Sequence, residues 1–149
     1  MKNVLAIFLI LTAFPGLLFS QDTISRYYDK DWNKITNKNA AVYYGKSFKN
    51  NDLGWTTRDY YISGKLQMEG TFKSKKNKTK HGHFTYYYEN GQLKSEGDFV
   101  NNKHEGEWHY YYEHGQLKSK GSYRDGNYEG PWQYFFEDGQ LKSEGSYSI

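Results

Sequence analysis

Aromatic and polar residues alternate along most of the chain, and glycine or asparagine interrupts the alternation at regular intervals. Runs such as Gly82–Tyr88 and Gly106–Tyr112 place every second side chain on one face of an extended strand. The pairs Asn90-Gly91 and Asp138-Gly139 follow such runs and favour a two-residue type I′ turn, in which both residues adopt positive φ. The pattern predicts antiparallel hairpins without α-helix, so we expect an all-β protein.

The hairpin pattern repeats, since Gly82, Gly106 and Gly130 are spaced 24 residues apart. A looser copy precedes these three and carries three extra residues in the lysine-rich segment before Gly82. We expect four hairpin units, at about 55–81, 82–105, 106–129 and 130–149, stacked as an elongated antiparallel meander. Residues 21–54 share the composition without the period, and we expect them to form a β-rich N-terminal cap.

Counting outward from Asn90-Gly91 as a two-residue turn predicts which side chains share a face. Tyr88 should face Leu93, Tyr86 should face Ser95, and Phe84 should face Gly97. In the next units Trp108 and Trp132 should likewise face a glycine. A large ring opposite a glycine shields the bare backbone. We expect the buried face to hold these residues and their equivalents: Trp108, Tyr110, Tyr112, Leu117, Tyr123, Phe136 and Leu141.

The opposite face should be polar apart from one aromatic row, each member of which should lie opposite a Lys or Gln of its own hairpin. Such a row either stabilises the sheet by cross-strand contacts or receives a partner's side chains or a glycan. The candidate binding surface consists of Tyr60, Tyr87, Tyr111, Phe135, Lys94 and Lys118.

One dense run of positive charge lies before the second unit. It consists of Lys73, Lys75, Lys76, Lys78 and Lys80. Such a run can contact anionic lipid head groups or lipopolysaccharide phosphates. The alternative is a solvated insertion without a ligand.

The N-terminus has the pattern of a secretory signal peptide, expected over residues 1–20. Lys2 precedes the apolar run Val4–Phe19, and polar sequence starts at Ser20. A retained anchor is the alternative, but a membrane-spanning helix needs about 20 apolar residues. We expect export to the periplasm or the cell surface.

The composition limits the kinds of functional site that the chain can form. The chain has no cysteine, which excludes disulfides, thiolate metal ligands and cysteine nucleophiles. Of the 20 basic residues, 19 remain once Lys2 is removed, against 17 acidic residues. This near balance of charge does not favour a nucleic-acid partner. No nucleophile or phosphate-binding motif is present. His81 and His83 are interpreted as surface histidines and Glu89, Glu113 and Glu137 as turn-flanking residues, so we expect no enzyme, no metal and no cofactor.

The run Gly-x-Trp-x-x-Tyr-Tyr-x-x-Gly-Gln-Leu-Lys-Ser-x-Gly-x-Tyr, as in Gly106–Tyr123, resembles the MORN repeat in its bacterial variant. The resemblance implies a twisted sheet of hairpins with a binding or scaffolding role and no shared catalytic residues. Similar proteins resemble the YwqK-type antitoxin, a role that an exported chain could fill only against a toxin in the envelope.

Three hypotheses follow from the residues and the resemblance. The leading hypothesis is an exported module that binds an unknown protein partner in the cell envelope. Binding of an envelope lipid or glycan is the second hypothesis, and an immunity-like role is the third.

Overall fold

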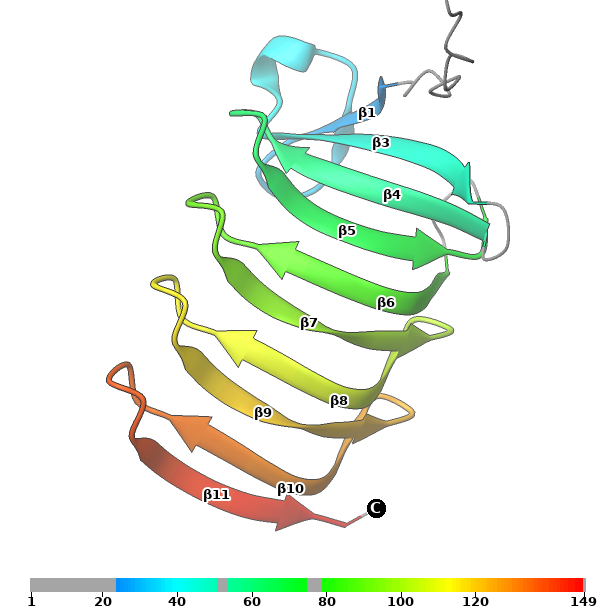
Figure 1. Ribbon diagram of the computed structural model, residues 1–149. Coiled ribbons are helices and arrows are strands. Elements are labelled where there is room, and N and C mark those ends of the chain that lie inside the picture. Colours follow the sequence, from blue (N-terminus) through cyan, green and yellow to red (C-terminus); the bar gives the residue numbers. More distant parts are fainter. Residues whose placement is uncertain (1–23, 51–53, 75–78, 149) are drawn as a thin grey trace, which may run out of the picture.

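A computed structural model describes residues 24–50, 54–74 and 79–148, so the predicted signal peptide lies outside the described residues. Eleven strands form one open antiparallel sheet (Figure 1). The strands are β1 (Ile24–Tyr28), β2 (Lys34–Ile35), β3 (Tyr43–Asn50), β4 (Gly54–Tyr61), β5 (Leu66–Phe72), β6 (Lys80–Tyr87), β7 (Leu93–Val100), β8 (Lys103–Tyr111), β9 (Leu117–Arg124), β10 (Asn127–Phe135) and β11 (Leu141–Tyr147). The predicted all-β meander is confirmed, and the described residues form no helix beyond one 3₁₀ turn at Lys38–Ala40.

Neighbouring strands in the sheet follow the chain order from β11 back to β3, after which β1 and then β2 complete the other edge. From β6 to β11 each strand is joined to the next by a short turn, so the sheet grows by one hairpin per unit. The described residues form no helix that is long and apolar enough to cross a membrane. The division of the chain into signal peptide, cap and four repeats stays a prediction.

Two kinds of turn alternate along the sheet. Between units, Asn101-Asn102 have φ values of 52° and 71°, and Asp125-Gly126 have 52° and 87°. Positive φ at both positions is the conformation of a two-residue type I′ turn.

Within a unit, the predicted two-residue turn is wrong. The Tyr88 N–H donates to the Gln92 carbonyl at 2.9 Å, and the Gly91 N–H donates to the Tyr88 carbonyl at 2.9 Å. The loop thus has three residues, and Gly91, with a φ of 92°, takes the left-handed position at its end. The same hydrogen bonds recur at the other three intra-unit turns, closed by Tyr61 with Lys65, Tyr112 with Gln116 and Phe136 with Gln140.

The extra loop residue changes the register beside each of these turns. Tyr87, not Tyr88, pairs with Leu93, and the register then shifts so that Tyr86 pairs with Ser95 and Phe84 pairs with Gly97 as predicted. Directly paired residues share a face, whereas Tyr86 and Tyr87 are neighbours in the chain and point to opposite faces. Each hairpin leucine therefore lies on the face opposite the core, which corrects the prediction that Leu117 and Leu141 belong to the buried face.

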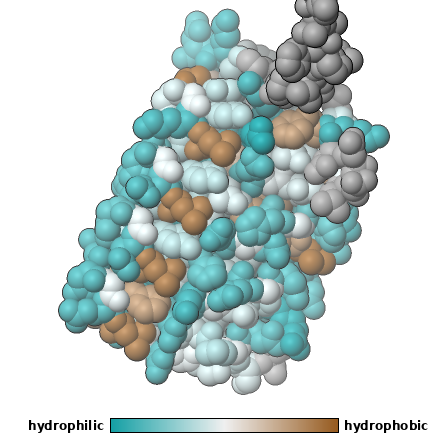
Figure 2. All heavy atoms as spheres, in the orientation of Figure 1, coloured by the Kyte–Doolittle hydropathy of each residue, from teal (hydrophilic) through white to brown (hydrophobic). Residues whose placement is uncertain are grey.

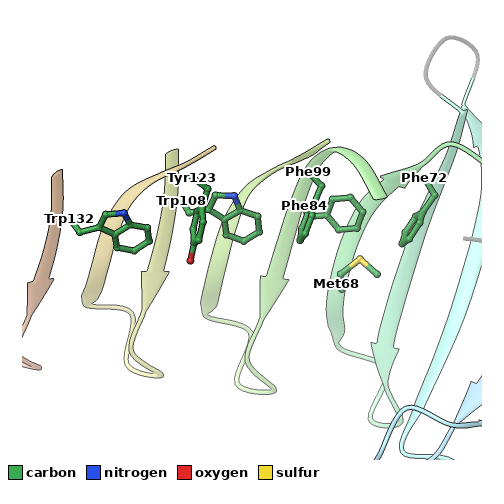
Figure 3. Close-up of a cluster of buried hydrophobic side chains, with 7 residues drawn as sticks. All are labelled: Met68, Phe72, Phe84, Phe99, Trp108, Tyr123 and Trp132. Atoms are coloured by element: carbon green, nitrogen blue, oxygen red, sulfur yellow. The ribbon is translucent and has the colours of Figure 1, made fainter. Parts of the chain in front are cut away.

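The core is a row of rings that cross the strands on one face (Figure 3). Phe84, Trp108 and Trp132 are at most 2% exposed although the described sheet has a single layer. Their rings lie edge to face with Phe99 and Tyr123, at centroid distances of 5.0 to 5.2 Å for the closest pairs. Edge-to-face contacts are a preferred geometry for aromatic pairs, and the row links one unit to the next.

Each of these rings covers a glycine of the preceding unit. Trp108 pairs with Gly121 across its own hairpin, as predicted, but its ring lies against Gly97, on which a Cβ would overlap the indole. Trp132 covers Gly121 in the same way, and its Nε1–H donates to the Ser122 carbonyl at 3.0 Å. The glycine is thus needed where two units meet, and not within one hairpin.

Candidate binding surfaces

The face opposite the core carries a double row of apolar side chains, which we name the aromatic–leucine stripe. Its aromatic members pair directly with its leucines, in place of the predicted Lys or Gln partners. The pairs are Tyr60 with Leu66, Tyr87 with Leu93, Tyr111 with Leu117, and Phe135 with Leu141. Successive pairs are two strands apart, which corresponds to about 9.6 Å. Figure 2 shows hydrophobic side chains that recur from hairpin to hairpin on the side of the sheet where the three-residue turns lie.

The stripe side chains are partly buried along the array, and Leu141 at its C-terminal end is 49% exposed. At the other end, the Tyr60 ring stacks on Tyr44 of β3 with centroids 5.0 Å apart. The Tyr111 hydroxyl donates to the Glu96 carboxylate at 3.3 Å, so a charged residue borders the apolar row. An apolar row with a polar border is the composition of a protein-binding surface.

The two lysines of the predicted binding surface lie elsewhere. Lys94 Nζ lies 5.5 Å from the centroid of the Tyr88 ring, and Lys118 Nζ lies 5.5 Å from that of Tyr112. Both lysines line a groove together with core-face residues such as Trp132. The structure therefore divides the predicted surface into two, because Lys94 is the additional residue of the register shift and does not pair with Tyr87.

The groove on the core face extends over several units. One part, of about 380 Å³, is lined by Lys94 and Lys118, and a second part, of about 240 Å³, is lined by Lys118 and Lys142. The two parts share Lys118 and Tyr134 and therefore form one depression across β7 to β11. The other residues that line it are aromatic residues and serines: Tyr88, Ser95, Tyr110, Tyr111, Tyr112, Ser119, Tyr123, Tyr128, Phe135 and Ser143.

A ladder of tyrosine hydroxyls fixes one wall of this groove. The hydroxyls of Tyr61, Tyr88 and Tyr112 each donate to a backbone carbonyl of the next unit, at 2.8 Å in all three cases. Sequence reasoning missed this role, although tyrosine directly before three of the four three-residue loops was the available signal. The ladder holds neighbouring hairpins at a fixed spacing, so the groove has a defined shape before any partner binds.

The predicted lysine run is only partly described, because Lys75, Lys76 and Lys78 lie outside the described residues. Lys73 is exposed, and its Nζ donates to the Asn101 Oδ1 at 2.6 Å. Lys80 is not in an exposed loop: it begins β6, its Nζ donates to the Tyr86 hydroxyl at 2.8 Å, and it lies 4.6 Å from the centroid of the Phe99 ring. Burial lowers the pKa of Lys80, so this lysine is part of the sheet interior and not of an anion-binding loop.

A polar cluster that the sequence did not reveal occupies the N-terminal part of the core face. Asp59 on β4 is 8% exposed and lies over Gly45 of β3, and its Oδ1 has no hydrogen-bond partner among the described residues. Burial raises the pKa of Asp59 to about 6, although the charges of Arg26 and Lys80 act in the opposite direction. Ser47 and Thr57 are hydrogen-bonded beside it at 2.9 Å.

The histidines show no arrangement for metal chemistry in the part of the chain that the structure describes. No group of three or more His, Cys, Asp or Glu side chains there could hold a metal ion. His83 instead contacts Asp98, with 3.0 Å between Nδ1 and Oδ1, at an exposed position.

Comparison with known proteins finds a similar repeat. The family model described as "MORN repeat variant" matches residues 80–101, 105–125 and 128–148. Each match covers one hairpin with its three-residue turn: β6–β7, β8–β9 and β10–β11. The three matches cover less than half of the chain, and the looser first unit lies outside them.

No curated protein matches the chain. Among solved structures, "Crystal structure of accessory secretory protein 1,2 and 3 in Streptococcus pneumoniae" is similar at 11% identity over 86% of this chain. The match spans 21% of that chain with a TM-score of 0.26, a likeness too weak to bear on fold or function.

Proposed function

We propose that the protein is an exported, non-catalytic repeat module for protein–protein interaction or scaffolding in the cell envelope. The observation that carries the proposal is the aromatic–leucine stripe, in which four successive hairpins repeat one apolar pair on the face opposite the core. MORN repeats are generally protein- or membrane-interaction modules, which agrees with such a role.

The stripe is more than the sheet requires for its own stability. The aromatic row on the core face already links the units, and its central rings are almost fully buried. The stripe leucines gain less, because none of the four is fully buried and Leu141 remains half exposed. Burying apolar area contributes about 25 cal/mol per Å². A partner that covers the stripe would therefore gain binding free energy from apolar area that the free sheet leaves exposed.

The stripe is tested by replacing both Tyr87 and Tyr111 with alanine and measuring capture of a specific partner from envelope extracts. Capture should fall strongly, because aromatic residues at an interface centre carry much of the binding energy. The matched control replaces Ile62 and Val100, two exposed apolar residues outside the stripe, and should capture as the unaltered chain does. Circular dichroism of each protein checks that the sheet is intact, and unchanged capture by the folded double variant would contradict the stripe as the binding surface.

Export is supported by the signal-like residues Val4–Phe19 and is tested separately. In fractionated host cells, a C-terminally tagged chain should be found in the periplasm or at the cell surface. N-terminal sequencing should show a start close to Gln21. An unprocessed chain in the cytoplasm would refute export but would leave the stripe proposal standing.

Binding of an envelope lipid or glycan is the second candidate, and the lysine-rich sequence 73–78 favours it. Co-sedimentation with anionic vesicles and with cell-wall material over a salt series tests this candidate. Absence of binding at low salt would eliminate it. An immunity-like role of the YwqK type is a third candidate, and a toxin-like domain encoded beside this gene would support it.

A further inference from the structure

The groove on the core face contains one lysine from each of the three matched repeats. Lys94, Lys118 and Lys142 occupy equivalent positions, and their Nζ atoms lie 5.5, 5.5 and 5.6 Å from the centroids of the Tyr88, Tyr112 and Phe136 rings. We propose that this lysine groove binds an extended acidic peptide that carries a carboxylate at every third residue, in the polyproline II conformation.

The spacing of the lysines selects this ligand conformation. Equivalent lysines are two strands apart, about 9.6 Å, because adjacent strands are separated by about 4.8 Å. A polyproline II helix has three residues per turn and rises about 3.1 Å per residue, so every third side chain points the same way at intervals of about 9.3 Å. Over the two intervals from Lys94 to Lys142 the mismatch is about 0.6 Å, which the flexible lysine side chains absorb.

Other regular peptides fit the three lysines less well. In a β-strand, side chains alternate between faces, so residues three apart point in opposite directions. In an α-helix, residues seven apart share a face but are separated by about 10.5 Å, and the mismatch grows to about 2 Å over two intervals.

The charges in the groove favour a carboxylate ligand. None of the three lysines takes part in an ion pair within the described residues. Each ammonium group lies over an aromatic ring, which does not neutralise its charge. Glu113 and Glu137 line a separate hollow on the turn side, next to Tyr88 and Tyr112. These two carboxylates repel acidic side chains from that side, so the ligand's carboxylates are directed to the lysines.

An acidic glycan is disfavoured by the same contacts. Sugars bind to aromatic residues by stacking on the flat face of the ring, but here a lysine ammonium lies over Tyr88, Tyr112 and Phe136. Tyr110 and Tyr123 are engaged with each other through their hydroxyls at 3.0 Å. The groove thus offers a row of cations at a fixed spacing and few open ring faces.

This inference rests on the proposed interaction role, but it uses different residues from the aromatic–leucine stripe. Either surface can therefore fail its test without the other. The single variant Tyr87→Ala should bind an acidic peptide as the unaltered chain does, because Tyr87 does not line the groove and pairs with Leu93 on the other face.

The test measures binding of a fluorescein-labelled peptide made of four Glu-Pro-Pro triplets to the purified chain in low-salt buffer by fluorescence anisotropy. Exposed ion pairs are weak, with about a two- to five-fold effect each, so replacing Lys94, Lys118 and Lys142 with glutamine should weaken binding about tenfold or more. The matched control replaces Lys34, Lys49 and Lys65, three exposed lysines outside the groove, and should change the dissociation constant less than about two-fold.

Two further probes decide the ligand class. A peptide of the same composition with its four glutamates in consecutive positions should bind more weakly than the triplet peptide, because only one or two carboxylates can reach a lysine. Equal binding of the two peptides, no binding of either, or tighter binding of oligogalacturonate would overturn the proposal. Circular dichroism confirms that each variant keeps the sheet, so that weaker binding is assigned to the lost lysines.

Discussion

The N-terminal and C-terminal halves of the sheet have the same strand arrangement. They differ in the side chains that fill the junctions, which are the contacts between neighbouring hairpins on the core face. In the C-terminal half, Trp108 covers Gly97 and Trp132 covers Gly121. In the N-terminal half, Thr57 stands at the position of these tryptophans, since it pairs with Gly70 as Phe84 pairs with Gly97. Thr57 is 1% exposed and fills its site with a hydrogen bond to Ser47, not with a ring.

The two halves also differ at the position two residues further along the same strands. Tyr110 pairs with Ser95 at a C-terminal junction, whereas Asp59 pairs with Gly45 at the N-terminal junction. A ring gains free energy from burial alone, while a buried carboxyl group must give up hydration that its neighbours replace only in part. The comparison indicates that the meander does not depend on one side-chain chemistry, but that its response to mutation and pH depends on which junction is changed.

The largest expected effect is at an aromatic junction. Trp108→Ala should destabilise the sheet by about 3–5 kcal/mol, because it removes a nearly fully buried ring that contacts two units. Thr57→Ala, at the equivalent polar junction, should cost only about 1–2 kcal/mol, since less area and one hydroxyl contact are lost. Urea unfolding followed by tryptophan fluorescence and circular dichroism measures both, and equal losses would show that the junctions do not differ as described.

The next effect concerns pH and the polar junction. The folded protein keeps the Asp59 proton up to about pH 6, whereas the ordinary pKa of 3.8 applies in the unfolded chain. Unfolding between these values releases the proton, so the stabilising contribution is complete below about pH 4 and is lost as the pH rises to about 6. A shift of about two pKa units corresponds to at most about 3 kcal/mol.

Asp59→Asn should remove this pH dependence. The charged and titratable groups that interact with Asp59 remain in the variant; they are Arg26, Lys80, Tyr28 and Tyr86. The difference in unfolding free energy between the two proteins is therefore measured from pH 4 to pH 7, so that other titrations cancel. A difference that stays constant over this range would show that the folded and unfolded pKa values of Asp59 are equal.

A smaller effect is expected from a matched pair of glycines. Gly121→Val places a side chain into the Trp132 ring and should cost about 1–3 kcal/mol by overpacking. Gly145 has the equivalent position on β11, where a Cβ meets no atom within 4 Å, so Gly145→Val should change stability by less than about 0.5 kcal/mol. Thermal unfolding of the two variants measures the difference, and equal melting temperatures would argue against rings that cover the glycine of the preceding unit.

Much of the fold could be predicted from the sequence because its signals are local and repeated. The spacing of Gly82, Gly106 and Gly130 predicts the hairpin units, and Asn101-Asn102 adopts the expected positive φ at both residues. The pairing of Phe84 with Gly97 is also confirmed. These features depend only on backbone conformation and on counting along a strand.

The details of the surfaces could not be predicted, because they depend on one loop residue and on contacts between distant strands. Asn90-Gly91 is compatible with a two-residue or a three-residue loop, and the choice decides whether Leu93 joins the core or the stripe. Lys80 and Asp59 are separated by 21 positions in the chain, yet each affects the pKa of the other in the folded sheet. No local pattern reveals such a pair.

The proposal that the stripe is the partner-binding face is tested most directly by site-specific photo-crosslinking in the native host. A benzoylphenylalanine residue replaces Tyr87 in one protein and Val100, an exposed position outside the stripe, in another. We expect a discrete crosslinked partner protein from position 87 and none from position 100. The same crosslinked protein from position 100 alone, or equal yields from both positions, would contradict the assignment of binding to the aromatic–leucine stripe.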